Sequence, residues 1–230
     1  INIDKIFKNT SSPIPASDDP YIFDKKEFNL PEQYTFEGEE LSLSDGLDHF
    51  HTDGLIVLHN GNMLYENYWN GNSKDSKHIS FSVAKSYLSA LIGIAVEEGL
   101  IDNIDDEVSK YLDDFKNTGY EKVTIKNLLQ MSSGIEFNED YLDPKSDINK
   151  FGRATARGKT FRDFAKSLKS SKEQGTFNHY VSLDTQVLAF ILESVTKMPV
   201  REFLYKRIWN KIGTESDAYY ITDTSGVDMA

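Results

Sequence analysis

The stretch FSVAKS at residues 81–86 opens the segment Ser82–Glu98, in which apolar side chains recur at helical spacing. They fall on nearly every side of the predicted helix, which is typical of a helix buried in the middle of a domain. Gly99 follows as a helix stop. Ser82 and Lys85 are three residues apart, so their side chains share one helix face. The sequence therefore predicts a hydroxyl and an amine side by side at the start of a buried helix.

A serine and a lysine at this S-x-x-K spacing are suited to nucleophilic catalysis. The serine hydroxyl is a poor nucleophile unless a base lies within hydrogen-bond reach. Desolvation and the helix dipole both lower the pKa of the Lys85 amine, so the neutral amine could accept the Ser82 proton. The dipole also favours an oxyanion at the helix start. The alternative is structural: Ser82 caps the helix, and Lys85 extends along its first turn to water.

The second candidate motif is Tyr180-Val181-Ser182, at the mouth of another amphipathic helix predicted over 182–196. A phenol aimed at Lys85 could relay a proton to a leaving group, and Ser182 could hold the same network together. The structural alternatives are that Ser182 is a helix cap and that Tyr180 is an ordinary half-buried aromatic residue.

Elsewhere the pattern predicts a hairpin, further helices and two irregular stretches. Strands at 54–59 and 63–69 flank Asn60-Gly61, a strong turn signal. Residues 1–40 hold four of the six prolines and predict an irregular lead-in. The polar stretch 138–157 predicts a long loop. Helices are expected at 41–50, 124–131, 160–170 and 201–212, with a short strand at 218–222.

Composition excludes several classes of function. The 37 acidic and 25 basic residues give a net charge of −12, which argues against nucleic acid and anionic membranes as partners. The absence of cysteine excludes disulfides, thiolate zinc sites and a cysteine nucleophile. The apolar run at 87–96 is too short to span a bilayer.

We also predict no metal and no cofactor. His49 and His51 alternate along the chain without a third ligand nearby, which disfavours zinc, and no glycine-rich phosphate loop is present. The chain begins with Ile1 and shows no signal peptide. We favour a periplasmic or otherwise exported location and leave a cytoplasmic one open, together with the oligomeric state.

Three segments together carry a family resemblance: FSVAKS at 81–86, LLQMSSGI at 128–135 and Tyr180-Val181-Ser182. They resemble the serine β-lactamase and penicillin-binding-protein superfamily, and specifically its class C β-lactamase-related branch. The match runs over 53–230 and looks most like 6-aminohexanoate-oligomer hydrolases and β-lactamase-like esterases. The resemblance implies an α+β, β-lactamase-like fold, with an antiparallel sheet packed with helices and a mainly helical lobe. It makes residues 1–52 a lead-in and 53–230 the N-terminal part of the hydrolase domain.

The resemblance also implies roles for individual residues. Ser82 would be the nucleophile, Lys85 the general base and Tyr180 the proton relay. Tyr141, on a mobile loop, and Ser182 would contact substrate, although Tyr141 could equally be an ordinary surface aromatic. The expected activity is cleavage of a small ester or amide through an acyl-enzyme. The alternative is a protein on the same scaffold that binds peptide or cell-wall fragments without turnover.

One departure from the family pattern concerns its third motif, of Lys-Thr-Gly or His-x-Gly type on a late strand. Nothing after Tyr180 matches it: Thr224-Ser225-Gly226 is a loop-like candidate without the preceding cation. We therefore expect this motif and the last strands of the sheet to lie beyond Ala230, in a longer protein.

Overall fold

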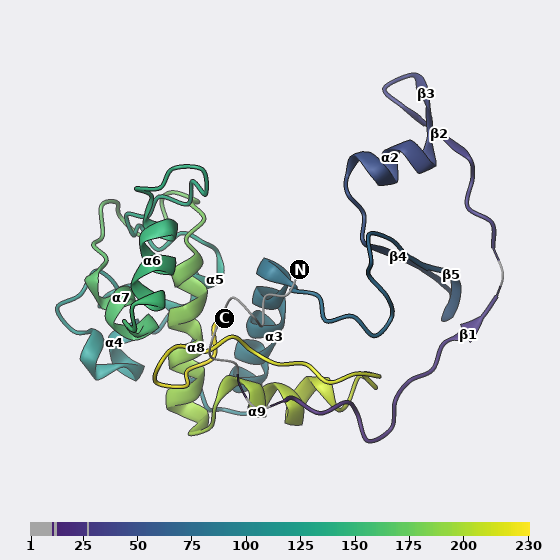
Figure 1. Cartoon of the computed structure of the whole chain (residues 1–230). Helices are drawn as coiled ribbons and strands as arrows, with labels where there is room; N and C mark the ends of the chain where they lie inside the picture. Colours follow the sequence, from purple (N-terminus) through teal and green to yellow (C-terminus); the bar gives the residue numbers. More distant parts are fainter. Residues whose placement is uncertain (1–10, 12, 27) are drawn as a thin grey trace. The chain divides into compact units, whose positions relative to one another are not determined.

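The computed structural model describes residues 11, 13–26 and 28–230, which pack as two compact units (Figure 1). The unit Pro20–His78 is called the hairpin unit here, and the unit of Ile1–Asp19 with Ile79–Ala230 is called the helical unit. These units are defined by packing, and the domain division after residue 52 stays a prediction. No helix in the described part of the chain is long and apolar enough to cross a membrane.

The hairpin unit is built on the predicted hairpin. Strands β4 (Gly54–His59) and β5 (Asn62–Tyr68) pair antiparallel, and the short strand β1 (Asp24–Lys25) adds to β5 in parallel, giving the order β1-β5-β4. Asn60 and Gly61 both have positive φ, 50° and 74°, as a tight two-residue hairpin turn requires. Helix α2 (Leu43–His49) lies within the predicted 41–50.

The prediction of an irregular lead-in over residues 1–40 was wrong in part. A second hairpin forms there from β2 (Gln33–Phe36) and β3 (Glu39–Ser42). Glu37 and Gly38 make its turn at φ of 51° and 85°. The prolines that suggested irregular structure precede both strands, so they remove no ladder hydrogen bond. The part of the prediction that falls on residues 1–10, 12 and 27 lies outside the described residues.

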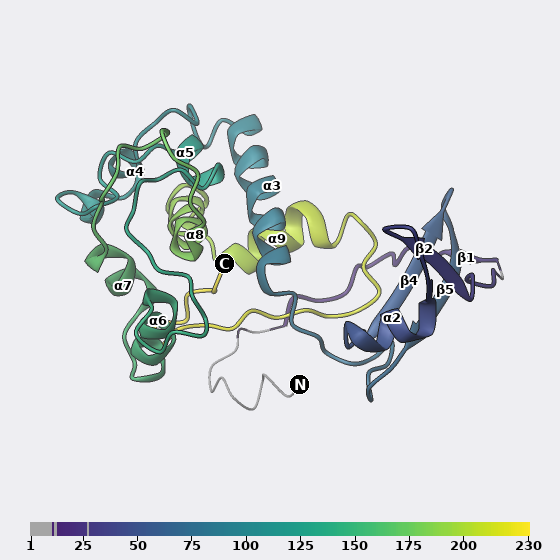
Figure 2. The same cartoon turned by 90° about the horizontal axis from the view of Figure 1, so that it is seen from above.

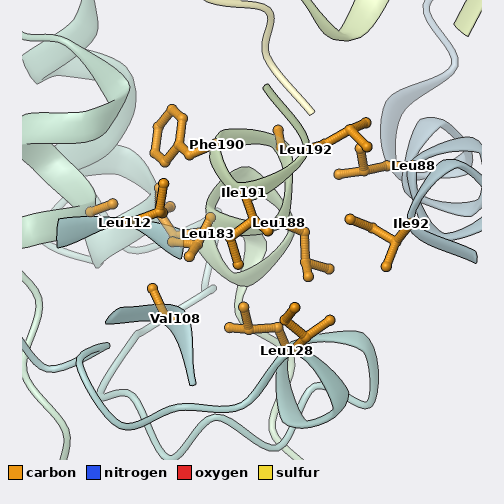
Figure 3. Close-up of a cluster of buried hydrophobic side chains, with 14 of the residues drawn as sticks. Leu88, Ile92, Val108, Leu112, Leu128, Leu183, Leu188, Phe190, Ile191 and Leu192 are labelled. Carbon is orange, nitrogen blue, oxygen red and sulfur yellow. The ribbon is translucent and has the colours of Figure 1, made fainter. Parts of the chain in front are cut away.

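The helical unit is organised around α8 (Ser182–Thr196), in which every residue from Leu183 to Leu192 is buried. Figure 3 shows its side chains meeting Leu88 and Ile92 of one neighbouring helix and Leu128 of another. The helix contacts α3, α4, α5, α7 and α9. The other elements of the unit are the 3₁₀ turns η1 (Phe81–Val83) and η2 (Asp113–Phe115), α3 (Ala84–Glu97), α4 (Val108–Tyr111), α5 (Ile125–Leu129), α6 (Asp147–Ala156), α7 (Phe161–Ser167), α9 (Val200–Leu204) and the π-helical turn η3 (Tyr205–Trp209).

The burial of helices α3 and α8 differs from what their sequences predict. Helix α3 was predicted to be buried on all sides, but it buries one stripe: Leu88, Leu91, Ile92 and Ala95. That stripe faces α8, beside which α3 lies in Figures 1 and 2. Gly99 ends α3 at φ 70°, as predicted. The helix with neighbours on several sides is α8, although its sequence reads as amphipathic.

Residues 138–157 are not one long loop, because α6 occupies Asp147–Ala156. The Ser146 hydroxyl caps this helix by accepting a hydrogen bond from the Asn149 amide. The one buried side chain of this helix is Phe151, whose ring centroid lies 5.1 Å from that of Phe164 on α7, and Ile148 and Ala154 pack beside it. A narrow apolar face at helical spacing, set in a polar stretch and packed on α7, stabilises α6. The strand predicted at 218–222 is reduced to isolated bridges from Ala218 and Thr222.

Gly134 and Gly93 offer a matched test of local packing. Gly134 has φ 74°, and an added Cβ would lie 2.2 Å from the Lys172 carbonyl oxygen. We expect Gly134→Ala to lower the free energy of unfolding by about 2 kcal/mol or more. Gly93, inside α3 and exposed, has no atom within 4 Å of such a Cβ, so Gly93→Ala should raise that free energy by about 0.5–1 kcal/mol. Chemical denaturation of both variants measures the two effects. Equal effects would contradict this account of the turn.

Candidate active site

The predicted serine and tyrosine meet, although 98 residues separate them in sequence. The Tyr180 hydroxyl donates a hydrogen bond of 2.8 Å to the Ser82 Oγ. Ser82 is exposed on η1, and α3 begins just after it with Val83 at the cap position and no side-chain cap bond. Ser82 is therefore not a helix cap. Its hydroxyl is held by a phenol from the segment that leads into α8.

The backbone immediately before Ser82 is strained. Phe81 has φ 46°, in the left-handed region that a bulky side chain rarely adopts, and its ring is exposed. Such a conformation costs about 1–3 kcal/mol and persists only where the surroundings impose it. Here it accompanies the turn that presents the Ser82 hydroxyl.

The amine of Lys85 is partly buried, one turn after Ser82. Burial lowers the pKa of Lys85, while the negative charges of Glu139 and Asp184 oppose that shift. Its Nζ lies 3.5 Å from the Ala230 carbonyl oxygen, at the long limit of a hydrogen bond. Lys85 thus does not extend freely into water, and its surroundings favour the neutral amine more than water does.

The segment 128–135 positions Tyr180 through backbone contacts. The His179 amide donates to the Met131 carbonyl at 2.7 Å, and the Gly175 amide donates to the Ser132 carbonyl at 2.8 Å. The His179 ring, with its proton on Nε2, donates to the Phe137 carbonyl at 2.7 Å. His179 is therefore a structural residue that fixes the backbone next to Tyr180.

Glu139 is a site residue that the sequence analysis missed. Its carboxylate accepts hydrogen bonds from the Ser182 hydroxyl at 2.5 Å, from the Ser182 amide at 3.2 Å and from the Tyr141 hydroxyl at 3.1 Å. It thereby joins the two predicted substrate-binding residues, and its charge acts on Lys85. The Ser182 hydroxyl donates to Glu139 and does not cap α8, whose cap residue is Val181.

The loop that carries Glu139 and Tyr141 is held by α6. The Asn149 side-chain amide donates to the carbonyl oxygens of Tyr141 and Asp143, at 3.0 and 2.9 Å. The ring of Tyr141 is nevertheless 66% exposed, so it lies at the surface of the site. This combination of a fixed backbone and an open ring suits contact with a ligand.

Thr224-Ser225-Gly226, the weak candidate for a third motif, forms a structural turn. Buried Asp223 accepts hydrogen bonds from the Ser225 amide and hydroxyl, and from the Phe161 amide that begins α7. These contacts anchor the turn to α7.

A family comparison now bears on this geometry. The beta-lactamase family profile matches residues 43–224, well over half of the chain. The chain belongs to the beta-lactamase family. The predicted superfamily is therefore confirmed, and so is its α+β fold.

Relatives of this beta-lactamase-family chain include named hydrolases. It is 32% identical over 196 residues to the 6-aminohexanoate-dimer hydrolase of Paenarthrobacter ureafaciens, covering 82% of this chain and 49% of that protein. A solved structure from Bacillus anthracis, provisionally described as a 6-aminohexanoate-dimer hydrolase, is 26% identical with a TM-score of 0.90, covering 99% of this chain and 62% of that one. A penicillin-binding-protein homologue from Pyrococcus abyssi shares the fold at 20% identity and a TM-score of 0.58, covering 72% of this chain and 40% of that one. The chain spans about half the length of the curated relative.

The role of Glu139 in this beta-lactamase-family site can be tested without an activity assay. Glu139→Ala leaves the Ser182 hydroxyl and amide without their acceptor, a loss of about 1–3 kcal/mol when such groups stay buried. We expect amide hydrogen exchange over residues 139–146 to accelerate at least about 10-fold. Glu136→Ala, the same change at an exposed position on the same segment, is the control. Indistinguishable exchange in the two variants would remove Glu139 as the link.

Proposed function

We propose that this chain carries the nucleophile of a serine hydrolase that cleaves a small amide or ester through an acyl-enzyme. Ser82 is the nucleophile, Lys85 the general base and Tyr180 the proton relay. The observation that supports this most directly is the 2.8 Å hydrogen bond from Tyr180 to Ser82, made next to a lysine whose pKa is lowered by burial.

The reaction follows from these groups. Neutral Lys85 accepts the Ser82 proton as the serine oxygen attacks the substrate carbonyl carbon. The proton then passes through the Tyr180 hydroxyl to the leaving amine or alcohol, whose bond to the carbonyl carbon breaks. Water attacks the resulting ester on Ser82 with the same groups in reverse, which releases the acid and restores the free serine. Because Tyr180 already contacts Ser82, the relay requires little rearrangement.

Two observations guide the substrate class. The relative from Paenarthrobacter ureafaciens is named for hydrolysis of an amide dimer, 6-aminohexanoate dimer. The neighbours of Ser82 in the chain, Phe81 and Val83, have side chains more than 60% exposed, and so does Tyr141, which interacts with Tyr180. Exposed apolar side chains near a nucleophile fit the aliphatic part of a substrate. We therefore place a linear amide or ester with an apolar chain first.

Active-site labelling tests the assignment of the nucleophile. In the full-length protein, a fluorophosphonate should form one adduct, on Ser82, and Ser82→Ala should form none. Tyr180→Phe should lower hydrolysis of an amide substrate by about 10²–10⁴-fold, the usual contribution of a positioned proton-transfer group. Tyr111→Phe is the control, since that hydroxyl bonds to Asp106 on another part of the unit.

The outcomes of this experiment separate the two candidate functions. Binding of a peptide or cell-wall fragment with equal affinity in wild type and Ser82→Ala, without adduct or turnover, would favour the non-catalytic binding protein. A labelled Ser82 with full activity in Tyr180→Phe would retain the nucleophile and reject the relay.

The pH dependence of labelling tests Lys85. A lowered pKa means that the amine loses its proton at a pH below the ordinary lysine value of about 10.4, so labelling of Ser82 should rise with pH and level off below that value. Lys85→Met should be slow and should lose this rise. A rate that climbs only above pH 10.4, or the same profile in Lys85→Met, would eliminate Lys85 as the base.

A further inference from the structure

Asp184 is an ionisable group in the core, and neither the fold nor the proposed relay explains it. It lies in the first turn of α8 and is fully buried. Its Oδ1 accepts a hydrogen bond of 3.0 Å from the Tyr120 hydroxyl, itself fully buried. Its Oδ2 is buried without a hydrogen-bond partner among the described residues. A carboxyl held in this way costs folding free energy, so a compensating role is expected.

The negative charge of Asp184 suggests such a role, because it acts on Lys85. Two carboxylates act on Lys85 through their charges, and they differ in burial. Glu139 lies half-buried on a loop, and Asp184 lies in the core. Screening by water weakens a charge at the surface and leaves a buried one strong. Glu139 nevertheless has the larger effect on the pKa of Lys85, and Asp184 has the second. Lys85 lies one helical turn before Leu88, on the face of α3 that packs against α8 (Figure 3), and Asp184 lies in the first turn of α8. Asp184 is therefore a buried counter-charge that acts on the amine beside Glu139.

We infer that Asp184 is a positioning residue that acts through Lys85, as the buried counter-charge for the ammonium that forms when Lys85 takes the Ser82 proton. This inference rests on the proposed function. The proton moves from the Ser82 Oγ to the Lys85 Nζ, and Asp184 neither gains nor loses one in that step. Its negative charge stabilises the cation in a place where water cannot.

The groups around Asp184 are consistent with this role. It is faced by Lys85 of α3, by Tyr120 before α5, by Ser133 and by Glu139. The cations on the other helices that pack against α8 have carboxylate partners of their own: Lys110 of α4 with Asp102 and Asp106, Lys126 of α5 with Asp105, Arg162 and Lys166 of α7 with Asp114, and Arg201 of α9 with Asp228.

Titration fits the same picture. Burial raises the pKa of Asp184 to about 7, against the opposing effects of the Ser133 and Tyr120 hydroxyls and the Lys85 charge. The carboxyl is therefore largely neutral well below pH 7 and anionic above it. The counter-charge is present in the alkaline range in which Lys85 can act as a base.

The experiment measures the pKa of Lys85 directly, from the pH dependence of its reaction with a small acylating reagent in the full-length protein. Asp184→Asn keeps the shape and an acceptor for Tyr120 but removes the charge. We expect the pKa of Lys85 to fall by about 1, at the lower end of the effect of a nearby opposite charge. The rise of Ser82 labelling should move to lower pH by the same amount, and its plateau should drop about 10-fold.

The control is Asp223→Asn, another buried aspartate whose hydrogen bonds hold the turn at 223–227. It should lower the melting temperature and leave the pKa of Lys85 unchanged. The reciprocal measurement guards against a variant that does not fold: in Lys85→Met, the Asp184 carboxyl, followed by ¹³C NMR, should titrate at higher pH than in wild type.

The outcomes are distinct. A pKa of Lys85 that is the same in wild type and folded Asp184→Asn, or an Asp184 titration unaffected by Lys85→Met, overturns the inference. Failure of wild type to label at Ser82 instead overturns the proposed function, and both titrations remain measurable in that case.

Discussion

The hydrogen bond between Tyr180 and Ser82 is the contact on which the arrangement of the site depends. It joins the starts of α3 and α8, the two helices whose packing forms the middle of the helical unit. Neither segment could place its side chain alone. Ser82 stands on a turn that follows a strained Phe81. Tyr180 stands on a segment fixed by hydrogen bonds from its own backbone and from the His179 ring to carbonyls of residues 131–137. The hydrophobic interface between the helices therefore sets the distance between the Tyr180 and Ser82 hydroxyls.

The segment LLQMSSGI at 128–135 supports the backbone that leads to Tyr180. Leu128 is fully buried against α8, which anchors one end. At the other end, the carbonyls of Met131 and Ser132 accept hydrogen bonds from the backbone leading to Tyr180, and Gly134 permits the close approach of residue 172. No side chain in the segment needs to touch a substrate for it to matter to the site.

Local patterns predicted the parts of the site that local geometry determines. Ser82 and Lys85 lie one helical turn apart, and the Tyr-x-Ser motif precedes an evident helix, so their roles could be proposed from spacing and resemblance. Glu139 could not, because a carboxylate in a polar stretch is most often solvated. Glu139 reaches its partner Ser182 only because its loop folds back onto the start of α8, and the two residues are more than forty positions apart in sequence. Helix α6 was missed although Ile148, Phe151 and Ala154 recur at helical spacing, because the stretch around them is polar and contains Pro144.

Asp184 was the harder omission, although the sequence held a signal for it. In α8, Asp184, Thr185 and Gln186 interrupt a run of apolar residues, and all three are buried. A solvated helix face does not place three polar residues in succession, because consecutive residues point to different sides. Gln186 holds the backbone of Asp228 and Ala230, Asp184 meets Tyr120, and the hydroxyl of Thr185 has no hydrogen-bond partner among the described residues. The beginning of α8, next to Tyr180, thus buries polar side chains and gains less packing free energy than the apolar part of the helix from Val187 onward. Polar groups at the end of α8 that follows Tyr180, on a helix whose remainder is apolar, are the pattern expected when electrostatics, more than stability, governs the choice of residues at that end.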